Sequence, residues 1–331
     1  MNHSLRSTLK LLLASAIALP LSLPVSALAT ETWPNKVIRV VVPYPAGGAA
    51  DLMGRLVAKK INEGLPNSRV VVENLAGGAT VPGALSVLRD PADGHALFMA
   101  SDNTLNINHW LLKDPRYDGD KDFTPVTVLN TYPHWLIVKA DGKHKSFEDL
   151  VAYIKSHPGQ ASISVNTVGG AAYLALDNWR RQNNLSFEII PYRGSPPAVS
   201  DLIGGQTDAH LDVVGSSAGH ARSGKVNPVA VLQSTPLKEF PQAKPQSYDD
   251  PNALTVRSNL SVVMRSGTPQ PVIDQLYAIL EKGVKDPDFV QALETLNFSP
   301  VMTPPAQAKQ FLVSETERYG KLIKESGLEQ Q

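Results

Sequence analysis

The sequence predicts an α/β fold in two lobes, each built on a doubly wound and mostly parallel sheet. Three observations favour this fold. Continuous β-branched runs, typical of strands buried on both faces, alternate with segments of helical hydrophobic spacing. The alternation occurs in both halves of the chain, and in each half a strand leads through a Gly-Gly turn into a helix. The chain has 331 residues, 42% of them hydrophobic, a length that suggests two domains.

The first lobe is expected to open with a strand at residues 37–42, followed by an amphipathic helix that ends near Gly64. The apolar positions at helical spacing in this helix are Leu52, Leu56, Val57 and Ile61. The elements predicted next are a strand at 69–72, a helix at 83–89 and a strand at 96–100. This β-α-β-α-β order predicts a parallel sheet with helices on both faces.

The second half of the chain repeats the pattern. Its predicted strands are 135–138, 161–165, 187–190 and 209–214, and its predicted helices are 147–156, 171–183 and 196–203. From Leu260 one more strand follows, then helical segments at 271–285, 287–295 and 305–325, which we expect to pack on the first lobe. The predicted lobes are therefore residues 30–132 plus 254–331, and residues 133–253. A cleft between them would receive the carboxyl ends of the strands.

The first 29 residues have the pattern of a secretory signal peptide. Arg6 and Lys10 precede an apolar segment, and Ala27 and Ala29 form a small-x-small cleavage signal. An uncleaved membrane anchor is the alternative, since residues 11–29 approach the length that spans a bilayer. Two prolines in that segment and its Ala-Leu-Ala ending disfavour the anchor. We therefore predict export to the periplasm, with cleavage after Ala29.

The composition excludes several classes of protein. Removing residues 1–29, which hold two basic residues and no acidic one, takes the formal net charge from 0 to −2. No basic stripe suits nucleic acid. The chain has no cysteine, which excludes a disulfide framework, a thiolate metal site and a cysteine nucleophile. A cysteine-free exported chain without a lipidated cysteine is expected to be freely soluble in an oxidising periplasm.

The turn at Gly47 and Gly48 is a candidate anion site. It joins a β-branched strand to a helix, and the first turn of a helix carries unpaired N–H donors and about half a positive charge. Glycines lack the Cβ atoms that would hold a ligand away from those donors. A second such turn, at residues 166–171, precedes the predicted helix of the other lobe. Taken singly, either turn could equally be an ordinary tight βα connection.

Residues 42–48, followed by Asp51 and Arg55, resemble the signature of the substrate-binding proteins of tripartite tricarboxylate transporters, the Bug or TctC-like family. Further stretches match in the same order, at residues 71–74, 90–94, 121–126, 191–195, 201–206, 208 and 267–269. The likeness covers nearly all of residues 32–325. It implies a two-lobe periplasmic-binding-protein fold of the Venus flytrap kind. It also implies a monomer that binds a di-, tri- or aromatic carboxylate and passes it to a membrane permease with a large and a small subunit.

The resemblance also implies a ligand site with one wall on each lobe and with no cofactor or metal. The implied ligand-binding residues are Tyr44, Ala46, Gly47, Gly48, Ser101, Asp102, Asn166, Thr167, Gly169, Gly170, Ala171 and Asp212. Asp212 follows a strand, where it could accept a hydrogen bond from a ligand amine, hydroxyl or protonated carboxyl. Its alternative role is to cap the next helix.

The sequence departs from the family in two places. Where the family carries serines and often a histidine, this chain has Gly170, Ala171 and Tyr173. Backbone donors remain but the serine hydroxyls are missing, which favours a dicarboxylate or aromatic acid over citrate. Where the family commonly has a Trp-Phe pair, this chain has Asn259 and Leu260, which leave more room or add an amide. Whether Tyr173 and Asn259 contact the ligand stays open.

Enzymatic functions have weaker support. Residues 215–219 read G-x-S-x-G with Ser217 at the centre, as in a hydrolase nucleophile elbow. The last histidine is His220, so no base follows where an α/β-hydrolase needs one, and we predict that the protein is not an enzyme. The turn at Gly47 lacks the spacing of a dinucleotide or P-loop motif. His210 and Asp212 share a strand face but lack a third metal ligand. A binding protein that serves a signalling partner is the remaining alternative.

Overall fold

The computed structural model describes residues 33–330, apart from residues 67, 168, 248 and 257. The predicted signal peptide, its cleavage site after Ala29, and Val168 in the second glycine turn lie outside the described residues. Among the described residues we find no helix with the length and hydrophobicity that a bilayer-spanning segment requires.

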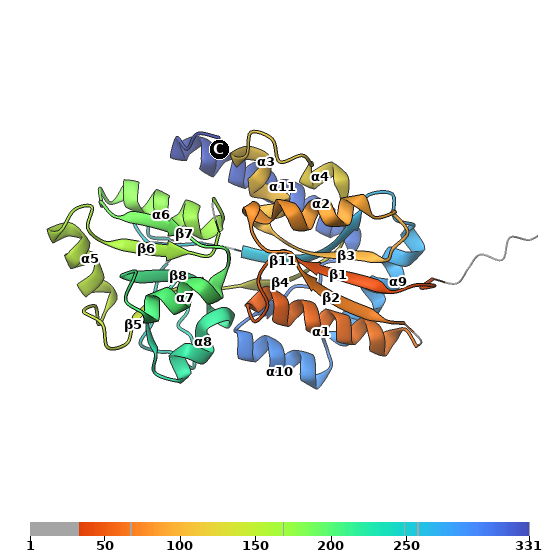
Figure 1. Ribbon diagram of the computed structural model, residues 1–331, viewed down its shortest axis with the longest axis horizontal. Coiled ribbons are helices and arrows are strands. Elements are labelled where there is room, and N and C mark those ends of the chain that lie inside the picture. The colour runs from red at the N-terminus through yellow and green to blue at the C-terminus, as the bar shows by residue number, and fades with distance from the viewer. Residues whose placement is uncertain (1–32, 67, 168, 248, 257, 331) are drawn as a thin grey trace, which may run out of the picture. The chain divides into compact units, whose positions relative to one another are not determined.

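Two six-stranded sheets organise the described chain (Figure 1). The first has the strand order β12-β4-β11-β3-β1-β2. Its strands are β1 (Ile38–Val42), β2 (Val70–Asn74), β3 (Ala96–Ser101), β4 (Phe123–Tyr132), β11 (Ser258–Arg265) and β12 (Ser299–Pro300). The second has the order β10-β9-β5-β8-β6-β7. Its strands are β5 (His134–Lys139), β6 (Ser162–Val165), β7 (Glu188–Pro191), β8 (Ala209–Val213), β9 (Val226–Val231) and β10 (Lys244–Pro245).

Both sheets are mixed. The pairs β1–β2, β1–β3, β6–β7 and β6–β8 are parallel, as predicted, whereas β11 is antiparallel to β3 and β4, and β5 is antiparallel to β8 and β9. The antiparallel strands are those by which the chain passes between sheets. β4 ends at Tyr132 and β5 begins at His134 in the other sheet, and β11 returns to the first sheet. No helical crossover separates β4 from β5, so neither strand has to follow the parallel direction of its neighbours.

Helices cover the sheets, which confirms the α/β class. The longer ones are α1 (Ala49–Gly64), α2 (Val81–Arg89), α5 (Phe147–Ser156), α6 (Ala171–Gln182), α7 (Ser195–Ile203), α8 (Val214–Arg222), α9 (Gln270–Gly283), α10 (Pro287–Leu296) and α11 (Pro305–Ser326). Short turns of helix are η1 (Gly78–Thr80), η2 (Asn103–Ile107), α3 (Asn108–Leu111) and α4 (Gly119–Asp122). In the first sheet, α1 lies on one face and α2 on the other (Figure 1). As predicted, α9 packs against α1 and α11 against β4, and α11 also contacts α6.

The burial of β1 explains its sequence. Val40 and Val42 pack with Met53 of α1 into one hydrophobic cluster, whereas Val41 packs with Phe98 into another on the opposite face. Side chains along a strand alternate between its faces, so a strand covered on both sides must be apolar throughout. One residue of the predicted helical stripe differs, because Leu52 is 43% exposed and Met53 faces the core instead.

We use lobe 1 for the first sheet with its helices and lobe 2 for the second. The strands of the first sheet come from residues 38–132 and 258–300, and those of the second from residues 134–245. We propose on this basis that the lobe boundaries lie where the sequence predicts them, at residues 132/133 and 253/254.

Candidate functional site

A cavity of about 60 Å³ lies between elements of both sheets. The helices α1, α6, α7 and α8 follow β1, β6, β7 and β8, and residues from the start of each helix line this cavity. The convergence has a topological cause, because the carboxyl ends of parallel strands meet at one edge of a sheet. A water molecule needs about 10–15 Å³ by the same measure, so the cavity suits a small ligand.

The start of α1 supplies the lobe 1 wall of the cavity. Gly48 caps the helix with an extended backbone, and Gly48, Ala49 and Ala50 line the cavity. The N–H of Ala49 donates to the hydroxyl of Ser216 on α8 at 3.1 Å, which joins the two lobes. Gly47, at φ +83°, makes the turn that precedes the helix. Its N–H is used internally, because it donates to Asp51 Oδ2 at 2.9 Å.

Asp51 is a structural residue in this turn. Burial raises the pKa of its carboxyl, but hydrogen bonds from Arg55, Gly47 and Asn74 outweigh that effect and hold the pKa below its usual value. Its Oδ1 accepts from the side-chain amide of Asn74, which also donates to the carbonyl of Tyr44. The ionised carboxylate thereby fixes the path of the chain from Tyr44 into α1.

The start of α6 supplies the lobe 2 wall. Asn166, Thr167, Ala171 and Ala172 line the cavity, and Gly170 caps the helix. Gly169 has φ +62°, and a Cβ atom at that position would lie 1.9 Å from Leu111 Cδ2 on α3 of lobe 1. This glycine therefore serves the contact between the lobes rather than the cavity surface.

Ser195 and Asp212 form a buried pair beside this wall. The Ser195 hydroxyl, at the first residue of α7, lines the cavity and donates to Asp212 Oδ2 at 2.6 Å. Burial raises the pKa of Asp212, but His210 and the hydroxyls of Ser195 and Ser217 together lower it below its usual value. Asp212 thus lies behind Ser195 and turns that hydroxyl's lone pairs toward the cavity.

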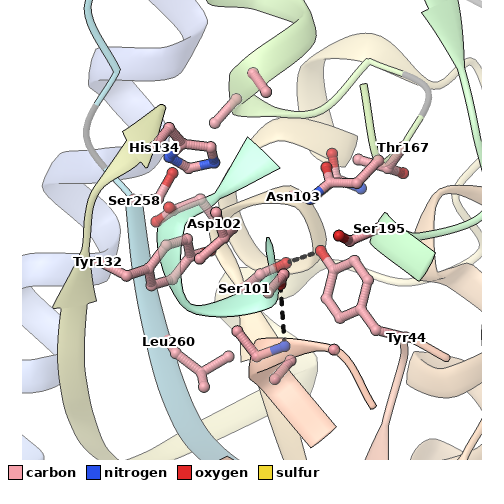
Figure 2. Close-up of a pocket in the computed structure, with 18 of the residues that line it drawn as sticks. Tyr44, Ser101, Asp102, Asn103, Tyr132, His134, Thr167, Ser195, Ser258 and Leu260 are labelled. Atoms are coloured by element: carbon pink, nitrogen blue, oxygen red, sulfur yellow. Dashed lines mark hydrogen bonds between the residues drawn. The ribbon is translucent and has the colours of Figure 1, made fainter. Parts of the chain in front are cut away.

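An acidic side chain lines the cavity from lobe 1 (Figure 2). Asp102 follows β3, and its two carboxyl oxygens accept from Asn259, Oδ2 from the backbone N–H at 2.7 Å and Oδ1 from the side-chain amide at 3.2 Å. Burial raises the pKa of Asp102 to about 7, against the opposing effect of the Asn259 hydrogen bonds. Asn259, whose role the sequence left open, therefore positions Asp102. Nearby, the Tyr44 hydroxyl bonds to Ser101 Oγ at 2.9 Å.

The passage between the sheets contributes an aromatic wall. Tyr132 ends β4 and His134 begins β5, and their ring centroids are 5.5 Å apart. Tyr132 also stacks on Phe298, which lines the cavity with Leu260. Burial lowers the pKa of His134 to about 4, so this imidazole is neutral at pH 7. Its Nδ1 has no hydrogen-bond partner within the described part of the chain.

No lysine or arginine is among the described residues that line the cavity. Partial positive charge there is supplied by the N-termini of the helices, whose first-turn N–H groups have no partner within the helix. Such a site can bind a carboxylate through main-chain donors. In the described chain, no three side chains of metal-ligating type come together.

Several of the sequence-predicted residues meet at this cavity. Those that line it are Tyr44, Gly48, Ser101, Asp102, Asn166, Thr167 and Ala171. Those that do not are Ala46, Gly47, Gly169, Gly170 and Asp212. Tyr173 packs against the core of lobe 2 instead.

Sequence reasoning missed a second set of lining residues, which includes Asn103, Tyr132, His134, Ser195, Ser216 and Ser258. Two of these residues lie in sequence motifs that could have identified them. Ser195 ends a motif that resembles the family, and Ser216 lies inside the G-x-S-x-G stretch. No sequence motif marks Tyr132 and His134, since they reach the site only because the chain passes there from one sheet to the other.

Ser217 is a packing residue. Its side chain is fully buried, does not line the cavity, and accepts a hydrogen bond from Trp135 Nε1 at 2.9 Å. We expect Ser217→Ala to leave ligand affinity within about twofold. The free energy of unfolding should fall by about 1–3 kcal/mol, because the indole N–H of Trp135 would lose its acceptor.

Calorimetric titration measures the ligand affinity of Ser217→Ala, and urea unfolding measures its stability. Ser216→Ala is the matched control, since this neighbouring serine lines the cavity and bonds to Ala49, and it should weaken binding. A large loss of affinity in Ser217→Ala alone would contradict the assignment.

The raised pKa of Asp102 makes stability depend on pH. Between about pH 4 and 7 the folded chain holds this proton while the unfolded chain has released it, so the contribution of Asp102 to stability falls as pH rises. Asp102→Asn does not titrate. We therefore expect its stability relative to wild type to rise across that window, by an amount on the order of a few kcal/mol, and to level off above pH 7. Urea unfolding at a series of pH values measures the difference, and a constant difference would contradict the burial argument.

Comparison with known proteins places the chain among receptors of one transporter type. Residues 53–328 match the family model described as tripartite tricarboxylate transporter family receptor. A UPF0065 protein from the tcbD–tcbE intergenic region of Pseudomonas sp. strain P51 is 32% identical, over 89% of this chain and 88% of that protein. The protein BugT of Bordetella pertussis is 28% identical, over 92% of each chain.

Solved structures confirm the two-lobe periplasmic-binding-protein fold. A structure described as a periplasmic transporter has a TM-score of 0.84 at 27% identity and covers 90% of this chain and 99% of its own. The periplasmic binding protein BugD has a TM-score of 0.83 at 26% identity, with 90% and 100% covered. Rpa4515 of R. palustris, solved with adipate, has a TM-score of 0.84 at 23% identity, with 90% and 100% covered, and supports the fold.

Proposed function

Because the chain belongs to the tripartite tricarboxylate transporter receptor family, we propose that it captures a small organic carboxylate and passes it on chemically unchanged. One observation supports a carboxylate as the ligand. Helices from both lobes begin at one cavity, and none of the described lining residues is a lysine or an arginine. A site of this kind attracts a carboxylate to main-chain N–H groups.

The contacts we propose come from both lobes. On lobe 1 the N–H groups of Gly48 and Ala50 face the ligand, since that of Ala49 donates to Ser216, and on lobe 2 those of Ala171 and Ala172 do so. Asn166 and Thr167 add side-chain polar groups. The hydrogen bond from Ala49 to Ser216 draws the lobes together over the ligand. Excluding water in this way strengthens each electrostatic contact.

The cellular compartment and the transport partner that we propose are those expected for a member of this family. We propose that residues 1–29 are removed as a signal peptide after Ala29 and that the mature chain works as a monomer in the periplasm. The partner we propose is a membrane permease with a large and a small subunit. Burial of Ser217 supports the absence of a serine hydrolase activity, because a nucleophile must reach its substrate.

Thermal shift with the mature chain tests the proposal. The panel consists of mono-, di- and aromatic carboxylic acids, each paired with its neutral amide. We expect at least one acid to stabilise the protein and its amide to have no effect. A ligand at 100 times its Kd stabilises by about 2.7 kcal/mol, which such a screen detects. Mass spectrometry after incubation should recover the acid unchanged. Equal stabilisation by the amides, or no response to any acid, would contradict carboxylate capture.

A further inference from the structure

A second cavity, of about 290 Å³, adjoins the ligand cavity described above and also takes its walls from both lobes. We call it the vestibule. Residues 43–44 and 77–80 line it from lobe 1, and residues 166–167 and 191–193 line it from lobe 2. Tyr44, Asn166 and Thr167 line both cavities and form the partition between them. The vestibule therefore lies directly beside the proposed carboxylate site.

The vestibule lies on the side of the cleft where the chain does not connect the lobes. The chain passes from β4 to β5 and returns in β11, and all three strands lie inside their sheets. The vestibule is lined instead by segments at the ends of β2 and β7, each of which forms one edge of its sheet. In Figure 2, Tyr44 and Thr167 lie on one side of the ligand cavity, and Tyr132 and His134 on the other. Hinge opening separates most widely the parts farthest from the connections, so the vestibule marks the mouth of the cleft.

A third cavity is a poorer route for an anion. It shares the lining residue Ala171 with the ligand cavity, but Thr255 and Val256, which also line it, belong to the connection that leads into β11. Its wall contains Arg318, whose guanidinium is paired with Glu315 at 2.6 Å. An approaching anion would therefore meet a neutralised cation on the hinge side of the cleft.

Arg193 gives the vestibule an uncompensated positive charge. Its side chain is exposed and forms no ion pair within the part of the chain that the structure describes. Among the described residues that line the vestibule, Arg193 is the only charged one. Asp201 does not line it, and its carboxylate accepts from the hydroxyl of Tyr192 at 2.6 Å.

The side chain of Arg193 reaches from lobe 2 toward lobe 1. A Cβ atom at Gly77 would lie 3.7 Å from Arg193 Cδ, which is van der Waals distance. The lobes are also in contact at the next residue, since a Cβ atom at Gly194 would lie 2.4 Å from Pro45 Cδ. Arg193 does not line the ligand cavity. Its charge is therefore placed over the approach to the site rather than in the site.

A cation at the mouth of the cleft meets a need that the ligand cavity leaves open. The partial charges of helix N-termini act only within about one turn of the helix. The chain without residues 1–29 has a net negative charge, and Asp102 lines the cavity, so neither attracts an anion from a distance. A charge at the rim of a binding site acts mainly on the association rate and on its dependence on salt.

Resting on the function proposed above, we propose that carboxylates enter the cleft through the vestibule and that Arg193 guides them there electrostatically, without contacting the acid once it is bound. Arg193 then sets the association rate and has little effect on the dissociation rate.

Stopped-flow fluorescence with the mature chain tests this inference, using the acid of the carboxylate panel that gives the largest thermal shift. Arg193→Met keeps the aliphatic part of the side chain and removes the charge, Arg193→Lys keeps the charge, and Arg193→Glu reverses it. At low ionic strength we expect the association rate constant to fall about threefold in Arg193→Met and to stay within about 1.5-fold in Arg193→Lys. In Arg193→Glu it should fall about tenfold, close to the square of the first factor, because the charge changes by two.

Two further measurements complete the test. Dissociation rate constants should change by less than about twofold in all three variants, so Kd from calorimetry should rise by the same factor as the association rate falls. At about 1 M salt, where the Debye length is about 3 Å, the variants should associate at nearly the wild-type rate.

Arg69→Met is the matched control. Arg69 is also an exposed arginine, but it precedes β2, at the opposite end of that strand from the vestibule, and it lines neither cavity. This variant should keep the wild-type association rate at every salt concentration.

The outcomes separate this inference from the proposed function. If Arg193→Met and Arg193→Lys lose the same amount, or if the loss persists at high salt, Arg193 acts through packing and the guiding role fails. A change found mainly in the dissociation rate would mean that Arg193 contacts the bound acid, which also contradicts the inference. Carboxylate capture stands in each of these cases, because the wild-type chain still binds the acid. If no acid of the panel binds, carboxylate capture fails and this inference fails with it.

Discussion

Replacing Gly48 with valine is expected to lower ligand affinity at least 100-fold while the protein still folds. Gly48 lines the cavity at the start of α1, and its backbone, at φ −80° and ψ 166°, is one that valine adopts readily. A Cβ atom there would meet only the carbonyl of Pro45, at 3.5 Å, so the branched side chain has room to form. It would then stand where the anion must approach the main-chain donors.

The size of this effect follows from the hydrogen bonds that the valine side chain would block. A hydrogen bond to a charged group contributes about 1.5–3 kcal/mol, and a 100-fold change in affinity corresponds to about 3 kcal/mol. Blocking one or two such hydrogen bonds at α1 is therefore sufficient. The cost to stability should be no more than about 1–2 kcal/mol, since valine is only a poorer helix cap than glycine.

Calorimetry with the acid that gives the largest thermal shift measures the loss. Gly48→Ala should give an intermediate loss, because its side chain is smaller. Gly219→Ala is the control, since a Cβ atom at Gly219 on α8 would meet nothing within 4 Å and this glycine does not line the cavity. Undiminished affinity in Gly48→Val would show that the anion lies elsewhere.

Replacing Gly169 with alanine is expected to lower ligand affinity by tenfold to 100-fold through the contact between the lobes. The new Cβ atom would lie 1.9 Å from Leu111 Cδ2, far inside van der Waals contact. Leu111 cannot turn away freely, because it is 1% exposed and packs with Ile107, Leu174 and Tyr319. Relief of the clash therefore moves the second glycine turn away from lobe 1, and with it the start of α6.

A matched glycine separates this effect from backbone strain. Gly169 has φ +62°, and Gly224, also in lobe 2, has φ +69° with nothing within 4 Å of a Cβ atom. Alanine at either position bears a similar conformational cost, about 1–2 kcal/mol. Gly224→Ala should keep wild-type affinity. Leu111→Ala combined with Gly169→Ala should recover part of the loss, because it removes the clashing atom. Equal affinities for Gly169→Ala and Gly224→Ala would mean that this contact plays no part in binding.

Much of the fold could be predicted from local sequence patterns. The alternation of β-branched runs with helical spacing indicated the α/β class, and residues 147–156 form a helix with the predicted bounds. The glycine turns led to Gly48 and Ala171, which line the cavity. These predictions succeed because the strand and helix periods, and the position of a turn after a strand, depend on residues close together in the sequence.

The rest of the site depends on how distant segments pair. Tyr132 and His134 reach the cavity because the chain passes between the sheets at residue 133, and no local pattern marks that passage. The pairing of β5 with β8 sets Trp135 opposite Asp212, and Trp135 bonds to Ser217 inside lobe 2. The register of β8 with its neighbours turns Asp212 into the interior, where its carboxylate accepts from Ser195, and it is Ser195, at the start of α7, that lines the cavity. Spacing along the sequence fixes the order of the elements, but only long-range pairing fixes which side chains meet.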